Sequence, residues 1–341
     1  MIDPEVIRAI HLNQNILCVS HINPDGDAYG SLLGMGWILR QLGKQPVLAM
    51  HDPTPKEFQH LPGINEIIGP KAVTDQYDLM ICLDASSSDR MGAVYQEKLH
   101  RAIPLVVIDH HITNTLFGSA NWVRPDCAAT CQMLVYLAAA LDIPLTGPLA
   151  ECLLTGIVTD TLCFRTSNTT AEVLEAAMHL IRGGADLATI TQRTLNQRSL
   201  GILKLWGMVL SNIQFAEGVI WVTISREQLK QAGRLTNDGQ LSSTLITATE
   251  ADISATFTEK MDEKGNSTVE CSFRAKPGFN VGTVAFEFGG GGHPAASGCT
   301  LPGALAEVSA KVVPALQLAR QKQRASNSSA VSPAEANVRP L

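Results

Sequence analysis

The stretch "SHINPDGDAYGS", residues 20–31, decides the fold because it directly follows the apolar run Ile16–Val19. A short apolar run that ends in a glycine-broken turn is typical of a buried strand followed by a helix. One histidine and two aspartates, His21, Asp25 and Asp27, lie within seven positions of this turn. The aspartates can simply form the turn. Two carboxylates this close also repel each other unless a cation or hydrogen-bond donors compensate them, so the stretch is equally a candidate metal site.

The length and composition indicate a two-domain globular protein. The chain has 341 residues, of which 45% are hydrophobic and 17% charged, and its net charge is -6. An acidic chain is a poor partner for long duplex nucleic acid, whose phosphates require many basic contacts. A short phosphorylated ligand stays compatible with this charge. We expect a soluble, cytoplasmic protein, because the sequence shows no signal peptide and no apolar run long enough to span a membrane. Its eight cysteines are scattered, which is typical of reduced thiols.

The first half of the chain predicts an α/β domain. Apolar runs predict parallel strands buried on both faces at residues 16–20, 79–83 and 105–108, and a weaker one in "QPVLAMHD", residues 45–52. Helical spacing separates or follows them at residues 29–42, 130–141, 148–158 and 170–182. Alternation of strands and helices implies a parallel sheet with covered faces. Gly30 and Gly34 are one turn apart and predict that the first of these helices packs closely on the sheet.

The second half predicts a smaller α/β domain. Alternating, β-branched segments predict strands at residues 219–225, 251–260 and 267–276, and helices are expected at 241–250 and 304–321. The apolar helical stretch 199–213 is interpreted as the connection between the domains. The predicted organisation is therefore a catalytic domain at 1–195, a helical linker at 196–215, a second domain at 216–321 and a disordered tail at 322–341.

Acidic and imidazole side chains follow the predicted strands. His21 ends the first strand, Asp84 the second, and Asp109, His110 and His111 the third. In addition, Asp160 ends the apolar stretch "LLTGIVT". Because ligands bind at the carboxyl edge of open parallel sheets, we expect these groups to converge there. Taken singly, the aspartates can be helix caps and the histidines surface groups, but the joint pattern favours a metal site.

The kinds of side chain indicate which ions fit. Carboxylates and imidazoles without thiolates suit Mn²⁺ first, with Mg²⁺ or Co²⁺ as alternatives. The oxygens suffice for two divalent ions, the usual arrangement for displacement at phosphorus. One carboxylate must then bridge them. Asp84, expected in the middle of the sheet edge, is the predicted bridge.

A second candidate site lies in the predicted second domain. The stretch "FGGGGHPAASGC", residues 288–299, has four consecutive glycines before His293. Such a loop lets backbone N–H groups approach an anion, although a flexible hinge has the same composition. Upstream, Arg274 in "SFRAKP" can pair with a phosphate, although a lone arginine is more often a surface residue.

Five motifs in this order resemble those of the DHH phosphoesterases, a family named for the triplet that here is Asp109-His110-His111. They are "SHINPDGDAYGS", "LDASSSDR", "VIDHH" and "TGIVTDTLCFR", followed by "GGGGHPAASG", which resembles the signature of the associated C-terminal domain in the RecJ-like branch. The resemblance covers roughly residues 15–320. It implies an active-site cleft between the parallel-sheet domain and the smaller domain.

The resemblance also implies a role for each matching residue. The implied metal ligands are His21 and Asp25 for one ion, Asp27, His110 and Asp160 for the other, and Asp84 for both. Asp109 would orient a neighbouring ligand, and His111 would contact the substrate phosphate and stabilise charge in the transition state. The implied clamp for a terminal phosphate or nucleotide is Arg274 with Gly289–His293, including Gly290, Gly291 and Gly292. Arg90 and Asn114 are supporting candidates.

The two-domain length resembles the nanoRNase and pAp phosphatase group of this family. The implied activity is hydrolysis of short single-stranded oligonucleotides and linear dinucleotides such as pApA to mononucleotides, and of pAp to AMP, by water that two metal ions activate. One alternative is an inorganic pyrophosphatase, which has similar metal motifs but a different C-terminal domain. Another is a nucleotide-binding regulator without catalysis, although such proteins usually lack metal ligands. The preferred nucleotide and the oligomeric state, a homodimer included, stay open.

Overall fold

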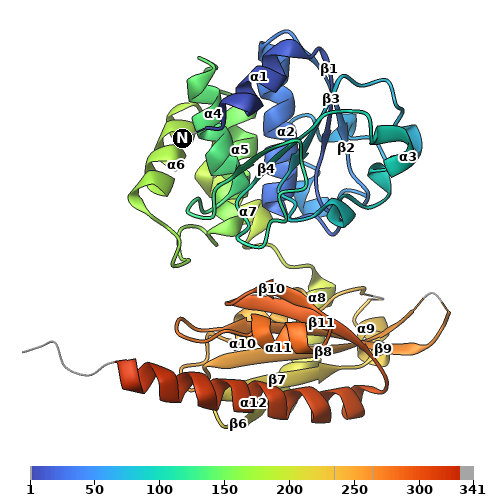
Figure 1. Ribbon diagram of the computed structural model, residues 1–341. Helices are drawn as coiled ribbons and strands as arrows, with labels where there is room; N and C mark the ends of the chain where they lie inside the picture. The colour runs from blue at the N-terminus through green and yellow to red at the C-terminus, as the bar shows by residue number, and fades with distance from the viewer. Residues whose placement is uncertain (1, 234, 263, 331–341) are drawn as a thin grey trace, which may run out of the picture. The chain divides into compact units, whose positions relative to one another are not determined.

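The computed structural model describes residues 2–233, 235–262 and 264–330. Its contacts divide the chain into two compact units, Met1–Gln197 and Arg198–Leu341. Each unit contains one β-sheet with helices packed against it (Figure 1). Among the described helices, none combines the length and the apolar content that a bilayer span requires. The predicted cleft between the domains stays a prediction.

The first unit has a five-stranded sheet in which every pair of neighbours is parallel. In spatial order the strands are β2 (Gln45–Ala49), β1 (Asn15–Val19), β3 (Leu79–Leu83), β4 (Leu105–Asp109) and β5 (Ala120–Val123). The four predicted strands are confirmed. Strand β5 was not predicted, because it is an edge strand in which Trp122 alone is buried and no apolar run marks it.

The two faces of this sheet are covered differently. On one face, residues such as Ile81 and Ile108 pack in a large core with the helices of the unit. On the other face, Met80 and Cys82 pack in a smaller cluster with the loop residue Met91. The helices are α1 (Pro4–Leu12), α2 (Gly26–Gln41), α3 (Glu97–His100), α4 (Thr130–Ala140), α5 (Pro148–Asp160), α6 (Ala171–Arg182) and α7 (Leu187–Thr194).

Helix α2 packs closely on helix α5, and the two glycines serve this contact. A Cβ atom at Gly30 would lie 2.6 Å from the carbonyl oxygen of Cys152, and one at Gly34 would lie 2.5 Å from the side chain of Leu153. The prediction that these glycines face the sheet was therefore wrong. They let α2 and α5 approach each other, which brings Asp27 and Asp160, at the ends of the two helices, to the same side.

The second unit has a six-stranded mixed sheet with the order β10-β11-β9-β8-β7-β6. Only β7 and β8 run parallel, and the other neighbours are antiparallel. The strands are β6 (Gln214–Ala216), β7 (Val219–Ile224), β8 (Ile253–Met261), β9 (Ser267–Ala275), β10 (Gly291–His293) and β11 (Ala296–Pro302). The helices are α8 (Leu200–Val209), α9 (Arg226–Gln231), α10 (Leu241–Leu245), α11 (Gly282–Glu287) and α12 (Leu305–Ala330).

Three predicted helices differ in extent or role. Helix α8, expected as a linker, packs its Leu205 and Val209 in the core of the second unit. Helix α10 ends at Leu245 instead of 250, because the β-branched residues that follow favour helix poorly. Helix α12 continues past the predicted end at 321 to Ala330, and the first residues of this extension, Lys322–Ala325, are good helix formers. The rest of the predicted disordered tail, 331–341, lies outside the described residues.

Candidate metal centre

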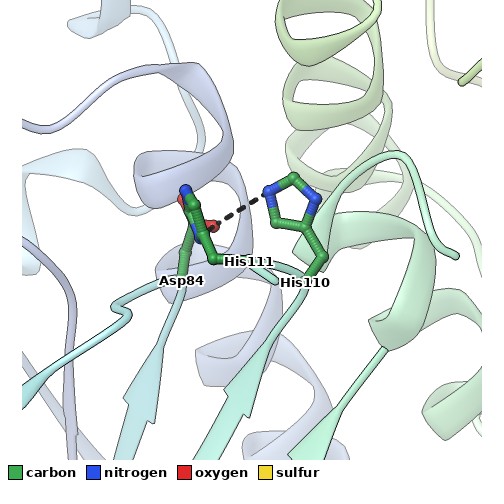
Figure 2. Close-up of side chains that lie close together, drawn as sticks. All are labelled: Asp84, His110 and His111. Carbon is green, nitrogen blue, oxygen red and sulfur yellow. Dashed lines mark ion pairs between the residues drawn. The ribbon is translucent and has the colours of Figure 1, made fainter. Parts of the chain in front are cut away.

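Three neighbouring strands deliver polar side chains at their carboxyl ends. His21 comes two residues after β1, Asp84 directly follows β3, and Asp109 is the last residue of β4. His110 and His111 follow Asp109, and Figure 2 shows both rings turned toward Asp84. Because β1, β3 and β4 are adjacent, these side chains share one edge of the sheet. The predicted convergence is therefore what the structure shows.

Asp84 follows β3, the central strand of the sheet. Its backbone is left-handed, with φ of 59°, a conformation in which Asp and Asn are enriched among residues other than glycine. One carboxylate oxygen, Oδ2, lies 3.5 Å from Nε2 of His21, and the other, Oδ1, lies 3.5 Å from Nε2 of His110. The two oxygens of one carboxylate thus face histidines from different strands.

Asp25 caps helix α2. Its Oδ1 accepts hydrogen bonds from the backbone N–H groups of Asp27 and Ala28, each 3.1 Å long. The simple interpretation of Asp25 as a turn and cap residue is therefore correct for one of its oxygens. The same Oδ1 lies 3.9 Å from Nε2 of His21, so the cap also holds a carboxylate beside the histidine.

Asp27 is completely buried, and the N-terminus of helix α4 compensates its charge. The backbone N–H of Thr130 donates to its Oδ2 over 2.6 Å, and that of Cys131 to its Oδ1 over 2.9 Å. The hydroxyl of Thr130 donates to Oδ1 of Asp84 over 3.1 Å. Sequence reasoning missed this support, because backbone donors leave no mark in the residue pattern. The helix prediction starting at residue 130 was the only available signal.

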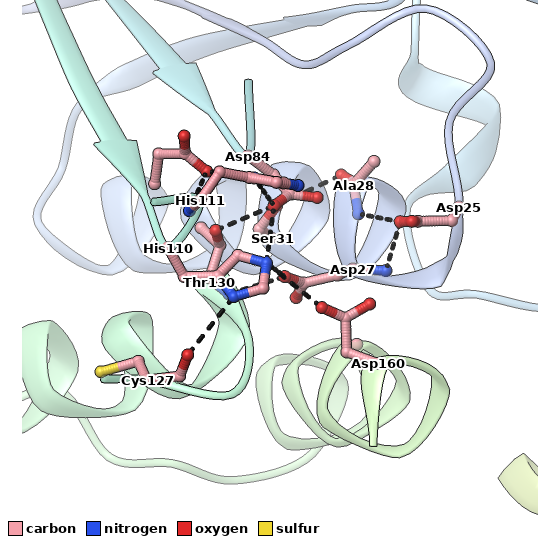
Figure 3. A network of polar contacts seen from close by, with 12 residues as sticks. Asp25, Asp27, Ala28, Ser31, Asp84, His110, His111, Cys127, Thr130 and Asp160 are labelled. Carbon is pink, nitrogen blue, oxygen red and sulfur yellow. Dashed lines mark hydrogen bonds and ion pairs between the residues drawn. The ribbon is translucent and has the colours of Figure 1, made fainter. Parts of the chain in front are cut away.

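Asp160, the last residue of helix α5, completes the cluster. Its Oδ2 lies 3.2 Å from Nε2 of His110, which in turn lies 3.9 Å from Oδ2 of Asp27 (Figure 3). Three groups of ligand atoms lie within 4.8 Å of one another: His21, Asp25 and Asp84; Asp84, His110 and His111; Asp27, His110 and Asp160. All six predicted metal ligands are therefore brought together.

The charges in this cluster perturb one another strongly. Burial, together with the charges of Asp84 and Asp160, raises the pKa of Asp27 well above its usual value. Burial also raises the pKa of Asp160 to about 6, against the opposing effect of His110. For His21, burial favours the neutral ring, but the hydrogen bond and charge of Asp84 outweigh it and raise the pKa to about 9. Without a metal ion, the cluster therefore binds protons more tightly than the same side chains do in water.

The donor atoms fit divalent cations. The cluster offers carboxylate oxygens and imidazole nitrogens only, which is the chemistry that Mn²⁺ and Mg²⁺ prefer. Asp27 and Asp84 are buried and need a compensating charge, because an isolated buried carboxylate is unfavourable. A pair of cations would supply that charge in place of protons.

Asp109 is buried behind the cluster and orients His111. Its Oδ1 accepts from Nδ1 of His111 over 2.7 Å, and its Oδ2 accepts from Nδ2 of Asn114 over 2.6 Å. The neighbouring ring of His110 instead places its Nδ1 3.3 Å from the carbonyl oxygen of Cys127. Asp109 therefore orients the histidine expected to contact substrate, whereas a backbone carbonyl orients the one expected to bind metal.

Arg90 supports His21. Its guanidinium nitrogen Nη2 lies 3.0 Å from Nδ1 of His21, and its carbonyl oxygen accepts from the N–H of Ile22 over 2.7 Å. The carbonyl oxygen of Ile22 lies 2.8 Å from the same Nδ1. These contacts leave Nε2 of His21 directed at Asp84. The supporting positions expected for Arg90 and Asn114 are both observed.

The other predicted site residues lie in the second unit. Arg274, near the end of β9, is held by its own unit: its Nε donates to Oγ of Ser243 over 3.1 Å, and its Nη1 donates to the carbonyl oxygen of Phe273 over 2.9 Å. Burial lowers the pKa of this guanidinium. Arg274 is thus a partly buried, positioned cation and not the ordinary surface arginine of the alternative interpretation.

The glycine-rich stretch is partly a strand and not only a loop, which corrects the prediction. Gly291–His293 forms the edge strand β10, paired with β11. A Cβ at Gly290 would meet the carbonyl oxygen of Gly298 and lie 2.6 Å from the Cβ of Cys299, whereas one at Gly291 would meet nothing within 4 Å. Close packing therefore explains the glycine at 290, whereas a Cβ at 291 would meet no atom of the described structure.

The fold and the site define a two-unit α/β protein with a candidate metal centre of carboxylates and imidazoles at a parallel sheet edge. The model of the DHH family N-terminal domain matches residues 15–157, and that of the DHHA1 domain matches residues 233–321. The chain belongs to the DHH family.

Named relatives agree with this assignment. The chain is 35% identical over 299 residues to the bifunctional oligoribonuclease and PAP phosphatase NrnA of Thermus thermophilus, covering 88% of this chain and 87% of that protein. It is 29% identical to the NrnA of Bacillus subtilis, covering 87% and 92%. An exopolyphosphatase-related protein from Bacteroides fragilis has the same fold, with a TM-score of 0.84, 23% identity and coverage of 94% and 96%.

Proposed function

We propose that this chain is a metal-dependent phosphoesterase that hydrolyses short oligonucleotides and linear dinucleotides to mononucleotides, and pAp to AMP. The names of the NrnA relatives from Thermus thermophilus and Bacillus subtilis give oligoribonucleotides and PAP as substrate classes, and the matches span most of both chains. Linear dinucleotides come from the family resemblance. The net charge of -6 agrees with small substrates and not long duplexes. We further propose a cytoplasmic location, in which the eight unpaired cysteines stay reduced.

One observation carries the proposal: the two oxygens of Asp84 face His21 on one side and His110 on the other. In this assignment His21 and Asp25 hold one divalent ion and Asp84 holds both. Asp27, His110 and Asp160 hold the second ion. We propose Mn²⁺, because the mixture of imidazole and carboxylate suits it better than the purely oxygen-loving ions.

A pair of bound ions supplies an activated water and neutralises charge on the phosphate oxygens. The side chains of the protein position the ligands and contact the substrate. Asp84 holds the two halves of the cluster at a fixed spacing, and the hydrogen bond to Thr130 limits the rotation of its carboxylate. His111, oriented by Asp109, is proposed to contact the substrate phosphate and stabilise the charge that develops on it.

The second unit is proposed to bind the substrate. Arg274 offers a guanidinium that can pair with a phosphate, and Gly290–His293 offers the backbone of the edge strand β10 and of the residue before it. The DHHA1 match over residues 233–321 covers both segments. This second domain favours a nucleotide hydrolase over an inorganic pyrophosphatase, because the pyrophosphatases of the family have a different C-terminal domain.

A panel of substrates tests the proposal. The metal-stripped protein is supplied with Mn²⁺ and incubated with pAp, pApA, short RNA, a cyclic dinucleotide or pyrophosphate, and the products are separated by chromatography. We expect AMP from pAp and mononucleotides from pApA and short RNA. Release of phosphate from pyrophosphate alone, or binding of pAp without hydrolysis, would contradict the proposal and favour one of the two alternatives.

The variant Asp84→Asn tests whether the cluster is the active site. Asn keeps the size of the side chain and tolerates the left-handed backbone, so the variant is expected to fold. It should lose at least about 100-fold in kcat/KM, equivalent to about 2.7 kcal/mol of transition-state stabilisation. Full activity of this variant in Mn²⁺ would show that the cluster is not the active site.

A further inference from the structure

Two cysteines of the second unit lie directly opposite each other on neighbouring strands. Cys271 in β9 and Cys299 in β11 are register partners in an antiparallel pair. The hydrogen bonds from Ala275 N to Ala295 O and from Gly303 N to Ser267 O fix the alternation of this ladder, which makes Cys271 and Cys299 a hydrogen-bonded pair. The Cα atoms of such pairs are about 5.5 Å apart, which is inside the range that a disulfide spans.

The two thiols also affect each other's ionisation. Cys271 lowers the pKa of Cys299 against the opposing effect of burial, and Cys299 raises the pKa of Cys271. Cys299 is 7% exposed and Cys271 is 1% exposed. Cys299 is therefore the better nucleophile and the more accessible thiol, and Cys271 lies behind it as a resolving partner.

Cys299 touches the backbone proposed to bind substrate. A Cβ at Gly290 would lie 2.6 Å from the Cβ of Cys299 and 2.7 Å from its Cα, so the two residues are packed without a gap. A disulfide brings the two sulfur atoms to about 2.05 Å from each other. Closing this bond shifts Cys299 and, through the contact with Gly290, the backbone at that glycine.

We propose that Cys271 and Cys299 are a redox-active dithiol that a hydroperoxide converts to a cross-strand disulfide, and that this disulfide weakens nucleotide binding by the second unit. The second half of the proposal rests on the proposed function of Gly290–His293. With hydrogen peroxide, the sulfur of Cys299 attacks one oxygen and becomes a sulfenic acid while the other oxygen leaves as water. The sulfur of Cys271 then attacks the sulfenic sulfur, and its oxygen leaves as a second water. The two thiols lose two protons and two electrons in total, and one hydrogen peroxide becomes two waters.

Peptide mapping tests the bond itself. The full chain, stripped of metal, is treated with excess hydrogen peroxide, freed of it, and digested without reduction. Mass spectrometry is expected to find the peptides of Cys271 and Cys299 joined with the loss of two hydrogens, and separated again after dithiothreitol. Absence of this product while the more exposed Cys163 is oxidised would overturn the proposal. The mapping needs no activity, so it stands even if the proposed function fails.

Kinetics test the consequence. After oxidation and addition of Mn²⁺, KM for pAp is expected to rise at least about twofold with little change in kcat, because substrate binding is affected and not the chemistry. Dithiothreitol should restore the original KM. A confirmed disulfide with unchanged KM would overturn the coupling to Gly290.

Two variants serve as matched comparisons. Cys299→Ala should show neither the joined peptide nor the rise in KM, whereas Cys163→Ala, which alters a cysteine outside the pair, should show both. Thermal unfolding checks that Cys299→Ala is folded, and Cys271→Ala replaces it if not. A rise in KM on peroxide treatment of the folded Cys299→Ala or Cys271→Ala variant would assign the sensitivity to another residue and overturn the proposal.

Discussion

The backbone N–H of Cys131 donates to Oδ1 of Asp27 over 2.9 Å, although 104 residues separate the two in the sequence. With the N–H of Thr130 on the other oxygen, the N-terminus of α4 holds both oxygens of a buried carboxylate. Helix N-termini carry partial positive charge and suit such an anion. The hydroxyl of Thr130 reaches Asp84 as well, so one helix end positions two carboxylates of the cluster.

Replacement of Thr130 isolates the hydroxyl contribution. Thr130→Val keeps the shape and the backbone bond to Asp27 but removes the hydrogen bond to Asp84. We expect the affinity for Mn²⁺ to fall about 10-fold, since groups that orient metal ligands typically contribute 10- to 100-fold. Titration calorimetry measures the affinity. Thr130→Ser should restore most of it, and equal affinities for Val and Ser would show that the hydroxyl plays no part.

Asp109→Asn tests the orientation of His111. The variant removes the charge that faces Nδ1 of His111, so kcat for pAp should fall about 10- to 100-fold with KM nearly unchanged. The charges of Asp109 and Asp84 raise the pKa of His111 against burial, so removing one of them lowers that pKa. The alkaline limb of the kcat profile should therefore move to lower pH. Asn114→Ala keeps the carboxylate and should leave that limb in place; a shift of the same size in both variants would contradict the role of the charge.

Metal binding should depend on pH in a defined direction. Without metal, His21 has a pKa of about 9, so it holds a proton at neutral pH, whereas a metal ligand must be a neutral imidazole. Binding therefore releases a proton, and affinity should rise with pH until the pKa of about 9 is passed. Calorimetry in buffers of different ionisation enthalpy counts the protons released. No proton release near pH 7 would show that His21 is not a ligand or is already neutral.

The free energy of unfolding of the metal-free protein should also depend on pH through His21. A histidine whose pKa is raised by folding stabilises the folded state fully below its unfolded pKa of about 6.5. That contribution is lost as pH rises through about 9. Denaturant unfolding of wild type and His21→Ala should therefore give a difference in stability that shrinks with rising pH. A difference that grows instead would contradict the sign.

Gly290, which directly precedes β10, and Gly291, its first residue, are a matched pair. Gly290→Ala brings a methyl group against the Gly298 carbonyl and Cys299, so it should lower Tm by several degrees. Gly291→Ala meets nothing within 4 Å and should leave Tm unchanged. If Gly291 contacts substrate, this variant should still raise KM for pAp. Unchanged Tm and unchanged KM together would remove Gly291 from the binding site.

The parts of this structure that could be predicted are those in which side chains carry the signal. Apolar runs marked the three inner strands β1, β3 and β4 and, more weakly, the edge strand β2. The polar residues that follow the three inner strands marked the cluster, because a parallel sheet places such ends together. Strand β5 could not be predicted, because pairing of its backbone and not burial of its side chains defines it. The same holds for β10, whose glycines have no side-chain pattern.

Some features of the candidate metal site could be predicted from the sequence and others could not. His21, Asp84 and His110 could be predicted from their positions, whereas the backbone donors at 130 and 131 could not. The partner of Asp109 was also beyond the sequence, since His110 and His111 both follow it directly in the chain. Only the ring orientations show that Asp109 meets His111.

The support that α4 gives to Asp27 has a consequence for how the protein matures. The cluster draws on groups from residue 21 to residue 160, so no fragment ending before helix α5 can assemble it. A nascent chain would capture its ions tightly only after nearly the whole first unit has left the ribosome. Tight uptake of metal would then indicate that the chain has been made as far as helix α5.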